Sequence, residues 1–149
     1  MGRIQSGRRA DYRWFHPVHT RWMDNDPFRH VNNANYLSYF DTAVTYCEIT
    51  EGIADLLNGP LQCVVAEVMC RYHHPVAFPD RLSIGLRVAR IGGSSVRFEL
   101  GVFRNEEQHA AAEGYFVHVF VDAATLRPVP IPEPARAKLR QFAVGSQED

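Results

Sequence analysis

The sequence has no apolar run long enough to span a lipid bilayer. Its first nine residues include three arginines but no apolar segment, so we expect no secretory signal there. The chain has no strong excess of positive or negative charge, since its formal net charge is −1. This balance argues against a general nucleic-acid-binding protein. We therefore expect a cytoplasmic protein with no nucleic-acid partner and no membrane insertion.

Cysteine is scarce, with only Cys47, Cys63 and Cys70 in the chain. The number is odd and no C-x-x-C spacing occurs, so the sequence predicts neither a disulfide framework nor a cysteine-based metal site. Buried free thiols in a reducing compartment are the interpretation that we adopt. A nucleophilic cysteine stays open as an alternative, although none lies near the expected helix start or a Ser/His cluster.

The length of 149 residues suits one domain with one core, and 46% hydrophobic with 22% charged residues is typical of globular proteins. We find no internal repeat, linker or low-complexity tract. We therefore predict a flexible basic arm over residues 1–12, a single domain over 13–143 and a flexible polar tail over 144–149.

Hydrophobic periodicity predicts the order of the secondary structure. A short strand over residues 15–22 precedes a long apolar helix over residues 34–52, with Asn32 or Asn33 as its N-cap. Alternating patterns then predict four strands. One face of the first strand is formed by Val64, Ala66, Val68, Cys70 and Tyr72. The last strand runs through Tyr115, Val117 and Val119. These strands cover residues 64–72, 82–88, 96–102 and 111–121, and a short helix follows over 133–142.

Turn signals at residues 92–94 and 105–108 join neighbouring strands as hairpins. Hairpin connections imply an antiparallel sheet. One apolar helix against one such sheet predicts a two-layer α+β domain in which the sheet wraps around the helix.

The most informative stretch is residues 22–36, which link the first strand to the long helix. It contains the carboxylates Asp24 and Asp26, His30 and several asparagines. A link that only turned the chain would need one glycine or one capping residue, so this concentration of polar groups indicates a site. Free N–H groups at a helix start favour a polarised oxygen, and a carboxylate beside them can attack or hydrate a carbonyl.

The Asp-x-Asp pair at residues 24–26, followed by His-Val-Asn-Asn at 30–33, resembles the signature of hot-dog-fold acyl-CoA thioesterases of the 4-hydroxybenzoyl-CoA thioesterase family. Tyr72 followed by Pro75 and Asp80, and Ile131-Pro132 before the last helix, are also similar to that family. The resemblance covers about residues 13–142. It implies a five-stranded antiparallel sheet around a long central helix and the hydrolysis of a coenzyme A thioester to a carboxylate and free CoA.

The same resemblance implies an acyl-CoA substrate, a homodimer or homotetramer with sites at the dimer interface, and no metal or redox cofactor. It places the catalytic carboxylate at Asp26, acting as nucleophile or as general base; a turn acid that binds local N–H groups is the alternative. We expect Asp24 to be structural, because acids two residues apart on an extended segment face opposite ways.

His30 is expected to polarise the thioester carbonyl through its backbone N–H or its ring, or else to hold the loop. Val31 and Asn32 are candidate backbone donors to the oxyanion, although Asn32 and Asn33 first suggest capping and loop-locking roles. Phe28 and Tyr36 are candidates for an apolar or aromatic substrate pocket, and core packing explains them equally well.

Further candidate substrate-binding residues lie on the strands. Glu67 could reach a partner's site if its strand lines the dimer seam, or it could be solvated. A basic, hydroxyl-bearing hairpin could hold the coenzyme phosphates, or could be an ordinary solvated turn. Its candidate residues are Arg90, Ser94, Ser95 and Arg97. His73 and His74 are adjacent in a strand and therefore point apart, so they predict no metal site.

Two other functions stay open. A hot-dog enoyl-CoA hydratase or dehydratase carries Asp-x-Asn-Pro-x-His; residues 24–30 are close to it but are one residue longer, with Asp in place of Asn. A non-catalytic acyl-CoA-binding module is the second alternative. No DNA-binding segment is evident, and Asp26 is present, which favours the enzyme.

Overall fold

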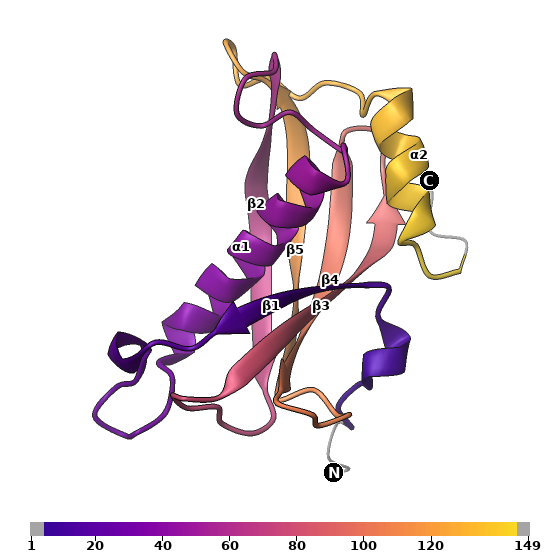
Figure 1. Ribbon diagram of the computed structural model, residues 1–149. Coiled ribbons are helices and arrows are strands. Elements are labelled where there is room, and N and C mark those ends of the chain that lie inside the picture. The colour runs from indigo at the N-terminus through magenta and orange to yellow at the C-terminus, as the bar shows by residue number, and fades with distance from the viewer. Residues whose placement is uncertain (1–4, 146–149) are drawn as a thin grey trace.

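A long helix lies across one face of a five-stranded antiparallel sheet (Figure 1). The protein is described by a computed structural model for residues 5–145. The strands are β1 (Trp14–His19), β2 (Leu61–Tyr72), β3 (Arg81–Ile91), β4 (Ser95–Arg104) and β5 (Ala112–Asp122). The helices are α1 (Asn33–Thr50) and α2 (Glu133–Gln141), with short 3-10 helices η1 (Arg9–Asp11) and η2 (Trp22–Asp24).

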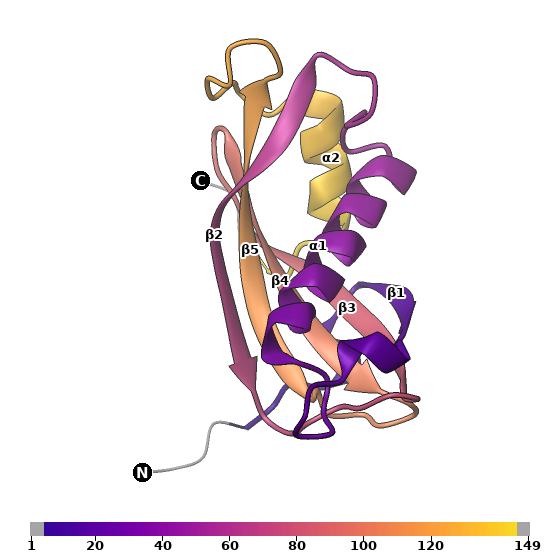
Figure 2. The ribbon, with the colours of Figure 1, turned by 90° about the vertical axis from the view of Figure 1, so that its left-hand side faces the viewer.

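The strands are ordered β1-β3-β4-β5-β2, and every neighbouring pair is antiparallel. Figure 2 shows both helices on the same side of the curved sheet. The predicted hot-dog fold is therefore confirmed. Local turn signals did not predict that β2 crosses to pair with β5, which leaves β1 and β2 as the two edges of the sheet.

Helix α1 begins and ends close to the predicted residues. The side chain of Asn32 accepts a hydrogen bond from the Ala34 N–H at 2.9 Å, which confirms it as the N-cap. Gly52, with φ of 70°, follows the last turn, where only glycine adopts a left-handed conformation without strain. The buried face, with Phe40, Ala43 and Val44 fully buried, packs onto the sheet.

Strand β2 departs from the single predicted face because it contains a β-bulge between Val65 and Glu67. A bulge shifts the alternation by one residue. Val68 therefore lies opposite inward-facing Phe116, whereas Val64 lies opposite outward-facing Val119. The predicted strand of residues 64–72 exists, but its proposed common face was wrong.

The last strand was predicted correctly in position, but its core face was missed. Phe116, His118 and Phe120 are among the buried residues of β5, and Tyr115 and Val117, which alternate with them, are more exposed. Every other side chain of a strand points to the same face. The core therefore includes a histidine, His118.

The N-terminal arm and the first strand also differ from the predictions. Tyr12 is buried, and the Arg9 N–H donates to the Gln108 carbonyl at 3.0 Å, so this part of the predicted flexible arm packs on the domain. Trp22 belongs to η2 and not to the first strand. At the other end the Val144 N–H donates to Val88 O. The remaining predictions for residues 1–4 and 146–149 lie outside the described residues.

Within residues 5–145, neither α-helix combines the length and the apolar character that a membrane crossing requires.

Candidate active site

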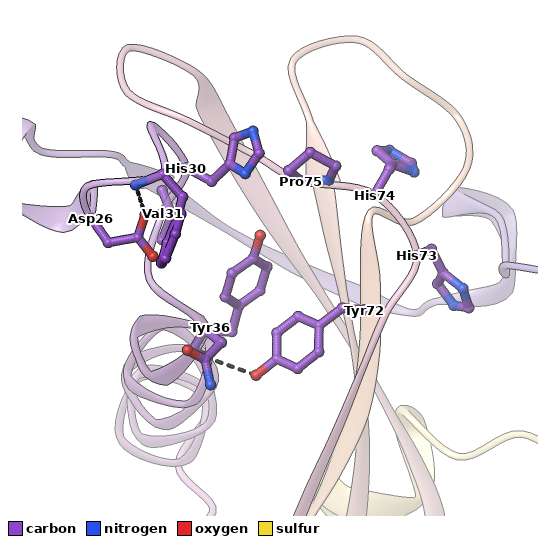
Figure 3. Close-up of a pocket in the computed structure, with 10 residues that line it drawn as sticks. Asp26, His30, Val31, Tyr36, Tyr72, His73, His74 and Pro75 are labelled. Atoms are coloured by element: carbon purple, nitrogen blue, oxygen red, sulfur yellow. Dashed lines mark hydrogen bonds between the residues drawn. The ribbon is translucent and has the colours of Figure 1, made fainter.

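A cavity of about 450 Å³ lies where the η2–α1 link meets the end of β2. Figure 3 shows Asp26 and His30 on one side, Tyr72 on the other, and Tyr36 between them. The lining residues are Asp26, Phe28, His30, Val31, Asn33, Tyr36, Tyr72, His73, His74 and Pro75. The structure thus brings together five of the predicted site residues from the link and the helix.

The loop around Asp26 is folded on itself by its own backbone. The Asp26 N–H donates to the His30 carbonyl at 2.9 Å, and the Arg29 N–H donates to the Asp26 carbonyl at 3.0 Å. Arg29 has φ of 69°, an uncommon conformation for a residue with a side chain and one that recurs at functional sites.

Only one of the two carboxylate oxygens of Asp26 accepts a hydrogen bond from the described residues. Its Oδ1 accepts a hydrogen bond from the Phe28 N–H at 2.9 Å, which fixes the direction of the side chain. Its Oδ2 has no hydrogen-bond partner among the residues that the structure describes. One oxygen is therefore oriented by the loop while the other is free to act on a ligand in the cavity.

Asp24 has the structural role that the sequence predicted. It is buried, and it accepts hydrogen bonds from the Arg21 N–H at 2.9 Å and from the Tyr39 hydroxyl at 2.7 Å. Burial by itself would raise the pKa of Asp24, but these hydrogen bonds and the Arg21 guanidinium outweigh it and hold the pKa below its usual range. Asp24 therefore anchors the link to helix α1.

Replacement of Asp24 by asparagine is expected to lower the free energy of unfolding by about 1–3 kcal/mol, because hydrogen bonds to a charged acceptor are lost. The folded pKa is depressed, so this contribution is complete above the unfolded pKa of about 4 and is lost as pH falls through the folded pKa. Urea unfolding at pH 7 and at pH 3 checks this. A difference between the two proteins that is the same at both pH values would contradict it.

The backbone donors differ from the prediction. The Val31 N–H donates to the Val76 carbonyl at 2.8 Å, and the Asn32 N–H donates to the Asp24 carbonyl at 2.9 Å. Both are occupied, so the prediction that they bind the oxyanion was wrong. In the part of the cavity wall from Asp26 to Asn33, the N–H groups of His30 and Asn33 are the ones that have no partner among the described residues.

Two tyrosines shape the cavity between α1 and β2. The Tyr72 hydroxyl donates to the Asn33 carbonyl at 2.8 Å, and the Tyr36 hydroxyl accepts from the Val76 N–H at 3.3 Å. Burial, followed by the influence of Cys70, raises the pKa of Tyr72 to about 12, so its phenol stays protonated. Tyr72 is therefore a hydrogen-bond donor and a wall of the cavity, not a base.

Sequence reasoning did not assign Tyr72, His73, His74 and Pro75 to the cavity. His73 is paired with Glu113 at 3.1 Å and His74 with Glu107 at 3.6 Å, so the adjacent histidines do point to different partners. The aromatic and histidine residues at the end of a strand, just before a proline, were the signal that could have identified this wall. The prediction of no metal on this pair was not tested.

Glu67 lies outside the cavity. It accepts a hydrogen bond from the Tyr115 hydroxyl at 2.9 Å on the outer face of the sheet, where the Arg97 guanidinium stacks over the Tyr115 ring at 3.8 Å. Neither Glu67 nor Arg97 therefore contributes to the cavity of its own chain.

The β3–β4 hairpin lies at the far end of the sheet, beside α2 (Figure 1). Strand β3 has 11 residues, about 35 Å at the usual rise per residue, and its first end is held near Asp26 by the Phe78 N–H bond to Asn25. The hairpin is bound to β5 through the Ser94 carbonyl and to α2 through Arg136. Arg90, Ser94, Ser95 and Arg97 therefore do not join Asp26 within one chain, and their binding of the coenzyme phosphates stays a prediction for a site that two chains share.

None of the three cysteines forms a disulfide within the described range, residues 5–145. Burial raises the pKa of the Cys47 thiol to about 12 and also raises the pKa values of Cys63 and Cys70. A thiol nucleophile requires a lowered pKa, so the structure favours the carboxylate as the reactive group.

A family model for the thioesterase-like superfamily matches residues 18–139. The chain belongs to this superfamily. The predicted resemblance to acyl-CoA thioesterases is thereby confirmed at the level of the superfamily, and assignment to the 4-hydroxybenzoyl-CoA thioesterase family stays a prediction.

Members of known structure share the fold over most of the chain. The PA5185 protein of Pseudomonas aeruginosa is 44% identical with a TM-score of 0.90, covering 95% of this chain and 99% of that one. A thioesterase from Thermus thermophilus, solved with coenzyme A and zinc, is 34% identical with a TM-score of 0.73, covering 87% and 98%. The long-chain acyl-CoA thioesterase FadM of Escherichia coli is 24% identical over 126 residues, 84% of this chain and 96% of FadM.

Proposed function

We propose that this protein is an acyl-CoA thioesterase that hydrolyses R–CO–S–CoA to a carboxylate and free CoA. The observation that carries the proposal is the carboxylate of Asp26, which has one hydrogen-bonded oxygen and one oxygen without a partner among the described residues. It lines a cavity at the N-terminus of the 18-residue helix α1. The named activities of FadM and the Thermus relative support the same chemistry.

The free Oδ2 of Asp26 attacks the thioester carbonyl carbon or takes a proton from a water molecule that does so. The carbonyl oxygen, which gains negative charge, is received by the N–H groups of His30 and Asn33 at the positive end of the α1 dipole. The C–S bond then breaks and the CoA thiolate takes up a proton. On the route through water the carboxylic acid forms directly, whereas on the nucleophilic route the acyl group is left on Asp26 as a mixed anhydride that water hydrolyses to the carboxylate and free Asp26. Only a carboxylate, water and backbone donors are needed, so we propose that no metal or redox cofactor takes part.

We propose that the coenzyme phosphates are held by arginines on the outer face of the sheet of a partner chain. Arg71 alternates with Tyr72 in β2 and lines an outer-face hollow together with Arg87 and Arg97. Its exposed side chain has no partner among the described residues. Arg104, the other basic candidate nearby, is held by both carboxylate oxygens of Glu107 at 3.0 and 2.6 Å. An unpaired guanidinium is the better phosphate ligand.

An assay on 2-enoyl-CoA and saturated acyl-CoA substrates tests the function. Free thiol is measured with a thiol reagent, and the enoyl double bond is followed by its ultraviolet absorbance. A thioesterase releases thiol from both classes of substrate. Loss of the enoyl absorbance without thiol release would identify a hydratase, and tight binding without either change would identify a binding module.

We propose that the protein acts as a homodimer or a homotetramer in the cytoplasm. Edge strand β1 has six residues and contains Pro17, whereas edge strand β2 has 12 residues and exposes Val64, Val65 and Val68. A long apolar edge without proline is a template for pairing with another chain. The end of β2 lines the cavity, so a partner on this edge would lie beside the site.

A lysine at Val65 is expected to shift the oligomer towards the monomer, because a charge on an edge strand opposes edge-to-edge pairing. Light scattering over a range of protein concentrations measures the effect, and activity should fall with the dimer fraction. Lysine at Leu57, which is exposed in the α1–β2 loop and is not part of the strand, is the control. An active wild-type monomer at low concentration would contradict the proposal.

A further inference from the structure

A second hollow, of about 650 Å³, also has Asp26 in its wall. Its other lining residues are Trp22, Met23, Asn25, Arg29 and Phe78, and none of these lines the first cavity. Asp26 is therefore the one residue common to the two spaces. A group that reacts at the Asp26 carboxylate has access to both.

The wall of the second hollow is made largely of apolar side chains that solvent reaches. Trp22 is 75% exposed and Met23 is 74% exposed, both in the three-residue helix η2. Trp22 packs edge-on against Phe78 with ring centroids 5.9 Å apart. Large apolar residues gathered on a surface next to a reactive group indicate a binding surface, because single exposed residues would be scattered.

Two groups extend from the carbonyl carbon of a thioester: the acyl chain on one side and, through sulfur, the coenzyme on the other. With the carbonyl at Asp26, each arm can enter a different hollow. We propose that the hollow of Trp22, Met23 and Phe78 holds the acyl group and that this group is a long aliphatic chain. This inference rests on the proposed thioesterase function and names its substrate class.

The polar groups favour this assignment of the two arms. The first cavity offers tyrosine hydroxyls and imidazoles, which suit the amides and hydroxyls of the coenzyme arm. In the second hollow the side-chain oxygen of Asn25 is occupied by the Phe78 N–H at 3.0 Å. Arg29 also lines this hollow, and Trp22, Met23 and Phe78 supply its apolar surface. The flexible thioether of methionine adapts to chains of different length.

The test is the chain-length profile of a Trp22→Ala/Met23→Ala variant. Each buried methylene is worth about a fourfold change in kcat/KM, so loss of contact with about two of them gives at least a tenfold fall for dodecanoyl-CoA. Butyryl-CoA, which is too short to fill the hollow, should stay within about twofold of the wild type. Leu57→Ala, which removes an equally exposed apolar side chain elsewhere, should change neither substrate.

Other outcomes overturn the inference while the thioesterase function stands. A fall of equal size for both substrates would place the coenzyme in this hollow, with Arg29 as its phosphate contact. A profile that changes in Phe28→Ala but not in Trp22→Ala/Met23→Ala would place the acyl chain in the first cavity. Failure of the wild type to release thiol from any acyl-CoA would refute the proposed function itself.

A binding measurement gives a readout that needs no turnover. The S-dodecyl thioether of coenzyme A cannot be hydrolysed at a carbonyl, and its chain should cover Trp22. With this ligand we expect a blue shift of the tryptophan fluorescence of the wild type, and with S-methyl-CoA a much smaller shift. The Trp22→Phe protein should show no shift with either ligand. Equal shifts with both thioethers, or a shift that persists in Trp22→Phe, would contradict the site.

Discussion

Replacement of Asp26 by asparagine or alanine is expected to lower kcat for acyl-CoA hydrolysis by at least about 100-fold, the usual scale for loss of a positioned base or nucleophile. The physical reason is that Oδ2 of Asp26 is the one carboxylate oxygen in the cavity that has no partner within the described chain. Asparagine keeps an oxygen for the Phe28 N–H but cannot act as a base. Steady-state thiol release on the best acyl-CoA substrate measures the effect.

The fold should tolerate this change, because Asp26 is only partly buried and makes one side-chain hydrogen bond. Asp24→Asn provides the matched control: it loses stability, but at a temperature where it is folded it should retain turnover far above that of Asp26→Asn. Turnover near that of the wild type in a folded Asp26→Ala protein would refute the mechanism.

The second large effect concerns stability and comes from a pair in the core. Glu48 of α1 and His118 of β5 are 0% and 2% exposed, and the Glu48 carboxylate contacts His118 Nδ1 at 3.0 Å. The second oxygen of Glu48 and Nε2 of His118 have no hydrogen-bond partner among the described residues. The two side chains therefore satisfy each other in the core, with the Cys63 thiol beside them.

Removal of one member is expected to lower the free energy of unfolding by about 3–5 kcal/mol, because the other is left buried without a partner. This applies to Glu48→Ala and to His118→Ala. A combined Glu48→Leu/His118→Phe protein should lose less than either single variant, since no polar group is then stranded. Urea unfolding followed by circular dichroism measures all three.

Glu99→Ala is the control for this set, because it breaks a partly exposed pair with Arg87 at 2.9 Å and should cost less than about 1 kcal/mol. Losses that simply add in the double variant, or single variants as stable as Glu99→Ala, would show that Glu48 and His118 do not form an interdependent pair.

The parts of the fold that the sequence predicted depend on short-range chemistry. Asn32 caps α1 because its side chain can accept from an N–H two residues later, and this is visible in the local order of residues. The choice of Asp26 over Asp24 came from the resemblance of residues 24–33 to the thioesterase signature. The extended alternation expected for the two acids does not occur, because Asp24 ends the 3-10 helix η2.

What the sequence did not predict depends on contacts between distant segments. Val31 and Asn32 were assigned to the oxyanion, but Val76 and Asp24 occupy their N–H groups, and Val76 comes from a loop far along the chain. The cavity wall from Tyr72 to Pro75 depends on the crossing of β2 to the sheet edge. No local pattern specifies that crossing.

The hairpin arginines show the same limit. Arg90 and Arg97 have the chemistry of a phosphate site, but the length of β3 separates them from Asp26 of their own chain. Local sequence does not specify which chain's site they would serve. Glu48 and His118 were missed for a related reason: a charged residue on a helix and a histidine in a strand become a pair only when both faces are known to turn inward.

A single-turnover reaction with protein in excess over a long-chain acyl-CoA tests the central claim most directly, because it reports bond cleavage at Asp26 without product release. We predict that the wild type converts the thioester to equal amounts of free CoA and carboxylic acid, whereas Asp26→Asn binds the thioester and leaves it intact. Intact thioester with the wild type, or cleavage at the same rate by Asp26→Asn, would contradict the account.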